Sequence, residues 1–129
     1  MAIGITSNEQ RYHFAMNLKR EVAIERQIEK IKQELAQLGH LRPGSLSTQY
    51  NVCGTPNCRC KASPPQKHGP YYQISYTRKS KSSTKFVAKK DLPEVRRQLK
   101  NYARLRLLTD RWIDLATELS NLRIAREKS

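Results

Sequence analysis

Three cysteines and one histidine fall within sixteen residues, in the pattern Cys53-x4-Cys58-x-Cys60-x7-His68. Thiolate sulfur and imidazole nitrogen are the ligands that structural zinc sites use, and four of them leave no coordination position for water. The pattern therefore predicts a structural Cys3His zinc site. The odd number of cysteines also argues against a disulfide framework.

The segment around these residues is rich in backbone breakers. Between residues 40 and 70 the sequence contains three glycines and five prolines and very few apolar side chains. We therefore expect no regular secondary structure there, and metal binding would supply the missing folding free energy. Two alternatives remain: the cysteines are free thiols and His68 is an ordinary loop residue, or His40 replaces His68 as a ligand.

The positive charge of the chain is concentrated in one stretch. The net charge is +14, and residues 50–106 hold fourteen basic residues against two acids, Asp91 and Glu94. The segments on either side mix both signs, as solvated surfaces usually do. A block of one sign indicates a polyanionic partner, and nucleic acid, either DNA or RNA, is the commonest one. An anionic membrane surface fits less well, because no helix combines these charges with a clean apolar face.

The candidate nucleic-acid contacts are basic side chains and one tyrosine: Arg59, Lys61, Tyr71, Arg78, Lys79, Lys81, Lys85, Lys89, Lys90, Arg97, Lys100 and Arg104. Tyrosine rings can stack on unpaired bases. Strand alternation places Tyr72 and Tyr76 on the face of Ile74, which favours a core role for both, whereas Tyr71 lies on the other face.

Two long helices are predicted on either side of this region. Ile24, Ile28, Ile31, Leu35 and Leu38 recur at spacings of four and three in the first helix, which ends at Gly39. A matching leucine-rich stripe follows Asp91 and Pro93, which suit a helix start, and continues to about residue 126. The stripes favour an intramolecular antiparallel core, and a homodimer through the same seams is the alternative.

Residues 71–77 and 83–88 are rich in β-forming residues and predict a two-stranded β-hairpin. The predicted fold is α+β and mostly α, with an antiparallel coiled-coil hairpin around a Cys-rich loop and this β-hairpin. We expect one domain with four parts: a coiled-coil helix over 1–39, the zinc loop over 40–70, the basic hairpin over 71–90 and the second helix over 91–129.

Three short motifs resemble a family of small uncharacterised bacterial proteins. They are Cys53-Gly-x-Pro-x-Cys-Arg-Cys60, His68-Gly-Pro-Tyr-Tyr72 and a following helix with Val95-Arg96 and Tyr102-x-Arg104. The resemblance covers about residues 40–125. Members of this family are often linked with transposases and mobile elements, which implies a nucleic-acid context and a transposase or another protein as partner through the helices. The resemblance transfers no catalytic residue.

The sequence thus predicts a zinc-ordered, nucleic-acid-binding accessory protein without catalytic activity. Asp91 and Glu94 are explained as helix caps, so no carboxylate cluster for a metal-dependent nuclease is visible. The alternatives are a coiled-coil scaffold subunit of a ribonucleoprotein and, less favoured, a strand-transfer enzyme with Tyr71 or Tyr72 as nucleophile. The sequence has no signal peptide and no apolar run of membrane-spanning length. We therefore expect a cytoplasmic protein, associated with the nucleoid if its ligand is DNA.

Overall fold

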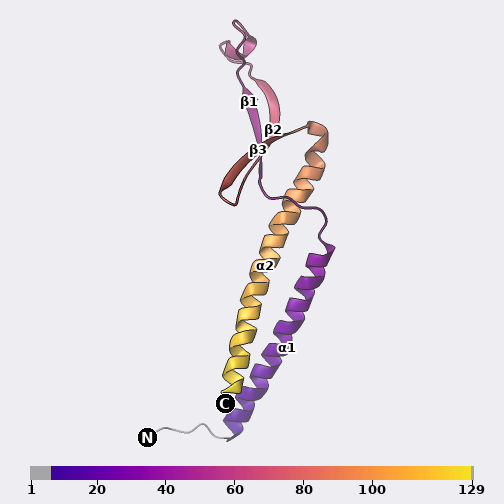
Figure 1. The fold of residues 1–129 in the computed structure, drawn as a ribbon, viewed down its shortest axis with the longest axis vertical. Coiled ribbons are helices and arrows are strands. Elements are labelled where there is room, and N and C mark those ends of the chain that lie inside the picture. Colours follow the sequence, from indigo (N-terminus) through magenta and orange to yellow (C-terminus); the bar gives the residue numbers. More distant parts are fainter. Residues whose placement is uncertain (1–6, 129) are drawn as a thin grey trace, which may run out of the picture. The chain divides into compact units, whose positions relative to one another are not determined.

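The structure is a computed structural model in which residues 7–128 are described. The chain forms two compact units, one from residues 7–38 and 104–128 and the other from residues 39–103. Figure 1 shows the elements of both units along the chain. The first unit is helical, and the second contains the only sheet of the described residues together with the Cys-rich loop.

The two helices are α1 (Ser7–Gln37) and α2 (Leu92–Glu127). Helix α1 ends two residues before Gly39, and α2 follows a short 3-10 turn, η2 (Lys89–Asp91), with Pro93 in its first turn. Proline is well tolerated there because the first backbone N–H groups of a helix have no partner within the helix. Helix α2 contributes its first twelve residues to the second unit and the rest to the first.

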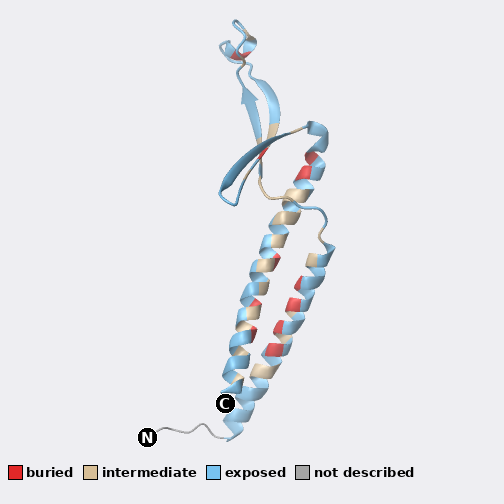
Figure 2. Ribbon diagram, in the orientation of Figure 1, coloured by how far each residue is buried: buried red, intermediate tan, exposed pale blue. Residues whose placement is uncertain are grey.

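The core of the first unit is the seam between α1 and the C-terminal part of α2. Its buried side chains alternate at spacings of three, four and seven residues, as the periodicity of the sequence requires. They are Ile24, Ile28, Ile31, Leu108, Leu115 and Leu119, with Leu35, Leu38, Trp112 and Leu122 packed against them. The two apolar stripes are therefore buried against each other within one chain (Figure 2).

Ion pairs beside this seam show that the helices run antiparallel. Arg20 pairs with Glu118 at 2.7 Å, and Glu34 pairs with Arg104 at 2.5 Å. Residue numbers therefore rise along α1 as they fall along α2. The ammonium group of Lys32 lies over the ring of Trp112, 5.4 Å from the ring centroid, within the range of a cation–π interaction.

The sheet of the second unit has three antiparallel strands in the order β1-β2-β3. They are β1 (Ser45–Asn51), β2 (His68–Arg78) and β3 (Lys81–Val87). The predicted two-stranded hairpin is therefore wrong, and so is the expectation that residues 40–70 contain no regular element. The overall class, α+β and mostly helical, agrees with the prediction.

The reason for the error is local. The glycines and prolines of residues 40–70 flank the segment Ser45–Asn51 instead of interrupting it. Leu46, Thr48 and Tyr50 alternate with polar residues in this segment, which is a strand pattern that the average composition of the longer segment conceals.

Strand β1 pairs with β2 and β2 with β3, so each face of the sheet can be read from the register. Leu46, Ile74 and Lys85 are directly opposite one another and share a face. Ile74 is fully buried there, and Leu92 and Val95 on the first turns of α2 in the same unit are also buried. The loop before β1 is tied to α2 by hydrogen bonds from the Arg42 N–H to the Gln98 carbonyl and from the Asn101 side chain to the His40 carbonyl.

Over residues 7–128, neither helix is long and apolar enough to cross a membrane.

Candidate metal centre and basic surface

The four residues of the Cys3His pattern meet in one place. One ligand atom of each of Cys53, Cys58, Cys60 and His68 lies within 4.8 Å of the other three. The Cys53 and Cys60 sulfurs are 3.6 Å apart, and the Cys58 sulfur is 3.3 Å from His68 Nε2. His40, the alternative ligand, is not part of this cluster.

Strand pairing and one short turn bring the four ligands together. Asn51 at the end of β1 pairs with His68 at the start of β2, so Cys53, two residues beyond β1, lies beside His68. Cys60 is in the 3-10 turn η1 (Arg59–Lys61), which follows Cys58 directly. The Lys61 side chain donates to the Thr55 carbonyl and closes the intervening loop. Cys60 is almost fully buried although its surroundings contain few apolar side chains.

The distances fit a tetrahedral metal ion. Zinc–sulfur bonds of about 2.3 Å place two thiolates about 3.8 Å apart, and a zinc–nitrogen bond of about 2.0 Å places a thiolate and an imidazole about 3.5 Å apart. The observed separations of 3.6 and 3.3 Å are close to these values. Three sulfurs and one imidazole nitrogen are a ligand set for a thiophilic ion, and the arrangement is compatible with a metal site.

Hydrogen bonds within the cluster favour the thiolate form of Cys53 and Cys58, whereas the pKa of Cys60 is raised, because the Cys53 backbone N–H, which lowers it, is outweighed by burial and the two neighbouring cysteines. The pKa of Cys53 is lowered to about 6, first by the backbone N–H of Thr55 and then by His68. The pKa of Cys58 is also lowered, mainly by the backbone N–H of Cys60. The pKa of His68 is raised because its ring hydrogen bonds to the sulfurs of Cys53 and Cys58. Thiolates gathered beside one imidazole attract a cation, and a divalent metal ion supplies more charge than a proton does.

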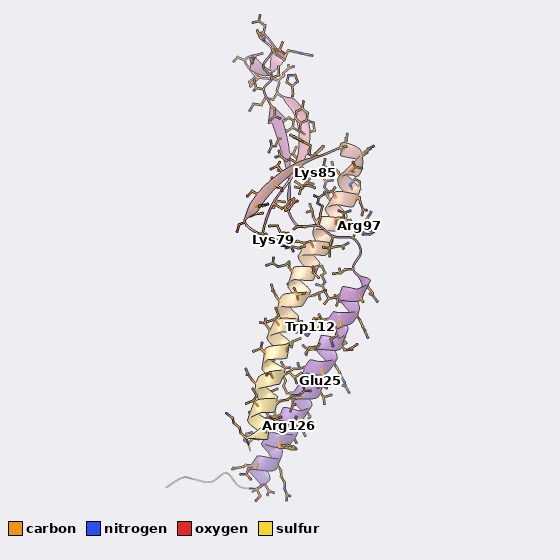
Figure 3. All side chains as sticks on the ribbon, viewed as in Figure 1. Glu25, Lys79, Lys85, Arg97, Trp112 and Arg126 are labelled. Atoms are coloured by element: carbon orange, nitrogen blue, oxygen red, sulfur yellow. The ribbon has the colours of Figure 1, made fainter. Side chains whose placement is uncertain are left out.

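Eleven of the twelve predicted nucleic-acid contacts lie in the second unit. Arg59 and Lys61 are in η1, Tyr71 and Arg78 are in β2, and Lys79 is in the turn after β2. Lys81 and Lys85 are in β3, and Lys89 and Lys90 are in η2. Arg97 and Lys100 are exposed on α2. Figure 3 labels Lys79, Lys85 and Arg97 within this unit.

Arg104 is the exception, because it belongs to the helical unit and pairs with Glu34 at 2.5 Å. Arg97 also has an acidic partner, Glu94, one helical turn before it. These two arginines are engaged with carboxylates, so they are weaker candidates for contact than the side chains of the hairpin.

The two units differ in how their positive charges are neutralised. In the helical unit, Arg20, Arg123 and Arg126 pair with glutamates, and one of these, Glu21, is buried. In the second unit the acids are Asp91 and Glu94, against thirteen basic residues. Within the described part of the chain, no ion pair involves the basic side chains of the hairpin and η2, which are Arg78, Lys79, Lys81, Lys85, Lys89 and Lys90.

The turn between β2 and β3 and the residues beside it present three of these charges to solvent, on Arg78, Lys79 and Lys81. Lys79 and Ser80 both have positive φ angles, 51° and 64°, as in the two-residue turns that match the twist of a hairpin. Arg78 pairs with Lys81 across this turn. Like charges placed directly opposite each other are unfavourable for the sheet, so their presence is not explained by stability.

The second unit also exposes an aromatic residue that the sequence analysis overlooked. Phe86 in β3 is 68% exposed and Tyr71 in β2 is 43% exposed, and both line one small cavity with Lys89. Tyr72 and Tyr76 are half-buried on the face of Ile74. Strand alternation places Lys85 on the face of Ile74 and Phe86 on the opposite face. This alternation is visible in the sequence and could have identified Phe86 as an exposed ring.

A protein-family comparison adds one finding. Residues 21–97 match the model of a domain of unknown function, DUF6788, over more than half of the chain. The chain belongs to this family. The DUF6788 region contains the whole sheet and all four residues of the Cys3His cluster. No curated protein and no solved structure is significantly similar to the chain.

Proposed function

We propose that this chain is a zinc-ordered nucleic-acid-binding protein, in which the Cys3His cluster fixes the loop between β1 and β2 and the hairpin carries the binding surface. The observation that supports it most strongly is the contrast between the units. Four arginines of the helical unit are paired with glutamates, whereas none of the basic side chains of the hairpin has an acidic partner among the described residues.

Gathering exposed, unpaired basic side chains on a small sheet lowers the stability of the fold, because the charges repel one another and make no compensating packing contacts. Phosphate groups of a nucleic acid would remove that repulsion and release their own counterions. A polyanion is therefore the partner that best explains this charge distribution.

Zinc is the metal that we propose for the cluster. Its ligand set of three thiolates and one imidazole is common among structural zinc sites, and a site with four protein ligands has no open position for catalysis. We assign the ion a structural role and propose a binding module without catalytic activity. The mobile-element context implied by the resemblance is part of the same proposal, with a transposase or another protein of such a complex as partner.

The test is the replacement of Lys79, Lys81 and Lys85 by alanine. All three are exposed and unpaired in the structure, so the fold should be retained. If each contacts a phosphate, affinity for a labelled DNA or RNA should fall at least about 10-fold. The slope of log K against log salt should become shallower by about 3. Fluorescence anisotropy measures both quantities.

A matched variant shows whether binding depends on where the positive charges lie or only on the net charge. Replacing Lys19, Lys30 and Lys128 by alanine removes the same net charge from exposed positions of the helical unit. This variant should bind almost as tightly as the parent chain. Equal losses in the two triple variants would mean that net charge alone governs binding, and the hairpin would then not be the binding surface.

A further inference from the structure

We infer that the uncharged face of the sheet binds an unpaired nucleic-acid strand, with its bases stacked on Tyr71 and Phe86. This inference rests on the proposed function and adds to it the class of ligand, single-stranded instead of duplex. The juxtaposition that carries it is two exposed aromatic rings and a lysine around one cavity of an open sheet.

The register defines this face, which we call the stacking face. Gln73 in the central strand is paired with Ser47 on one side and with Phe86 on the other, so the three side chains lie on the same side of the sheet. Tyr71 precedes Gln73 by two residues and shares that side. The complete set of residues on the stacking face is Ser45, Ser47, Gln49, Tyr71, Gln73, Ser75, Thr77, Ser82, Thr84 and Phe86.

None of these residues is charged, although the unit that contains them holds thirteen basic residues. Hydroxyl and amide groups on this face can donate to and accept from base edges, and aromatic rings can stack on bases of any sequence. Among the strand residues the charges lie on the opposite face, because Arg78, Lys81 and Lys85 share the face of Ile74. Lys89 borders the stacking face and lines the cavity beside Tyr71 and Phe86.

An uncharged face with exposed aromatic rings and a lysine beside it suits a single strand better than a duplex. In a duplex the base faces are covered by their neighbours, so exposed aromatic rings have nothing to stack on. In a single strand the bases can turn toward the stacking face while a phosphate reaches Lys89 at its border. A second copy of this chain is a poor occupant, because it would bring the same excess of positive charge to the contact.

The exposure of Phe86 is not explained by packing. A phenylalanine that is 68% exposed contributes little to a core, and burial of its apolar surface would be favourable by about 25 cal/mol for each Å². Gln73, which pairs with it, is half-buried and flanked by hydroxyl residues. The surroundings of Tyr71 also suit stacking more than nucleophilic attack, since its cavity is lined by Pro70, Tyr72, Phe86, Val87, Ala88 and Lys89, without a histidine or arginine.

The experiment compares a labelled dT12 and rU12 with a 20-bp duplex, for the full chain and four variants. Tyr71→Ala and Phe86→Ala should each weaken single-strand binding by about 5- to 100-fold, because each removes one stacking ring. Tyr71→Phe and Phe86→Tyr keep the rings and should bind within about 2-fold of the parent chain. None of the four changes the charge, so the salt slope should stay the same.

A matched control uses Phe14→Ala, which removes an exposed aromatic ring from the helical unit and should leave binding unchanged. Circular dichroism and zinc content show whether each variant keeps its fold. Lys89→Ala should weaken single-strand binding and reduce the salt slope by about 1, since it removes one phosphate contact.

The outcomes separate this inference from the function on which it rests. If the parent chain binds neither single strands nor duplex, the proposed function fails. If it binds duplex as tightly as single strands and the alanine variants have no effect, nucleic-acid binding stands and the stacking face is wrong. If Phe86→Ala instead abolishes self-association and leaves strand binding unchanged, the face is a protein interface, and the inference is likewise overturned.

Discussion

Gly69 follows the ligand His68, and its backbone shows how closely the cluster is held against the sheet. Its φ angle is 140°, and a Cβ atom at this position would lie 2.8 Å from the Gln49 carbonyl oxygen and 2.9 Å from the Tyr50 ring. Glycine alone tolerates both the angle and the contact. Any larger residue here would push β2 away from β1 at the point where the strands deliver His68 and Cys53.

At the scale of single residues, the Cys3His cluster was predictable because its members are close together in sequence. Cys53, Cys58, Cys60 and His68 needed no knowledge of the fold to be recognised, and the structure brings together the same four. Phe86 was missed because its role depends on which strand pairs with which. A ring becomes part of a surface only when the register places it beside Tyr71 and Lys89.

Purified protein should contain about one zinc per chain. Cys58→Ser should lower the zinc affinity by at least about 100-fold, because it removes a sulfur that would bind the metal directly, and loss of a group that only orients such a residue already costs about 10- to 100-fold. His40→Asn is the control, since His40 lies outside the cluster and should leave zinc binding intact. Elemental analysis and competition with a chromophoric chelator measure both. Full folding without metal in the presence of a chelator would contradict the structural role of zinc.

At the scale of elements, the helices could be predicted more closely than the sheet. A helix records its buried face in its own sequence at a period of 3.6 residues, so α1 and α2 were visible from local spacing. A short strand carries a weaker signal, and β1 is stabilised by pairing with β2, whose partner residues follow seventeen to thirty positions later. Ser47 and Gln73, for example, are twenty-six residues apart and are joined by a hydrogen bond.

Two adjacent leucines of α2 provide a test of the helical seam. Leu108 is 4% exposed in the core of the helical unit, whereas Leu107 is 60% exposed. Leu108→Ala should destabilise the chain by about 2–5 kcal/mol, because it leaves a cavity between the helices. Leu107→Ala should change the stability by about 0.5 kcal/mol or less. Thermal and chemical unfolding followed by circular dichroism measure the difference, and equal effects of the two substitutions would show that the helices pack through another face.

At the scale of the whole molecule, the two structural units also differ in how their basic side chains are paired. Four arginines of the helical unit pair with glutamates on the facing helix, as Arg123 does with Glu21 and Glu25 and Arg126 with Glu21. Among the described residues of the second unit, the only ion pair joins Arg97 to Glu94. The sequence showed the block of positive charge but could not show which charges are paired, because the partners of Arg20 and Arg104 lie more than sixty residues away. That information came only with the fold, and it makes Arg97 and Arg104 of α2 weaker members of the predicted surface than the basic residues of the hairpin.

The central claim is that the unpaired cations of the sheet unit bind phosphate groups. The most direct measurement is the affinity of the full chain for one labelled nucleic acid between 50 and 200 mM salt. With four or more phosphate contacts, the dissociation constant should rise about 100-fold across this range, linearly in a double-logarithmic plot. An affinity that does not change with salt, or no binding at the lowest salt, would contradict the claim.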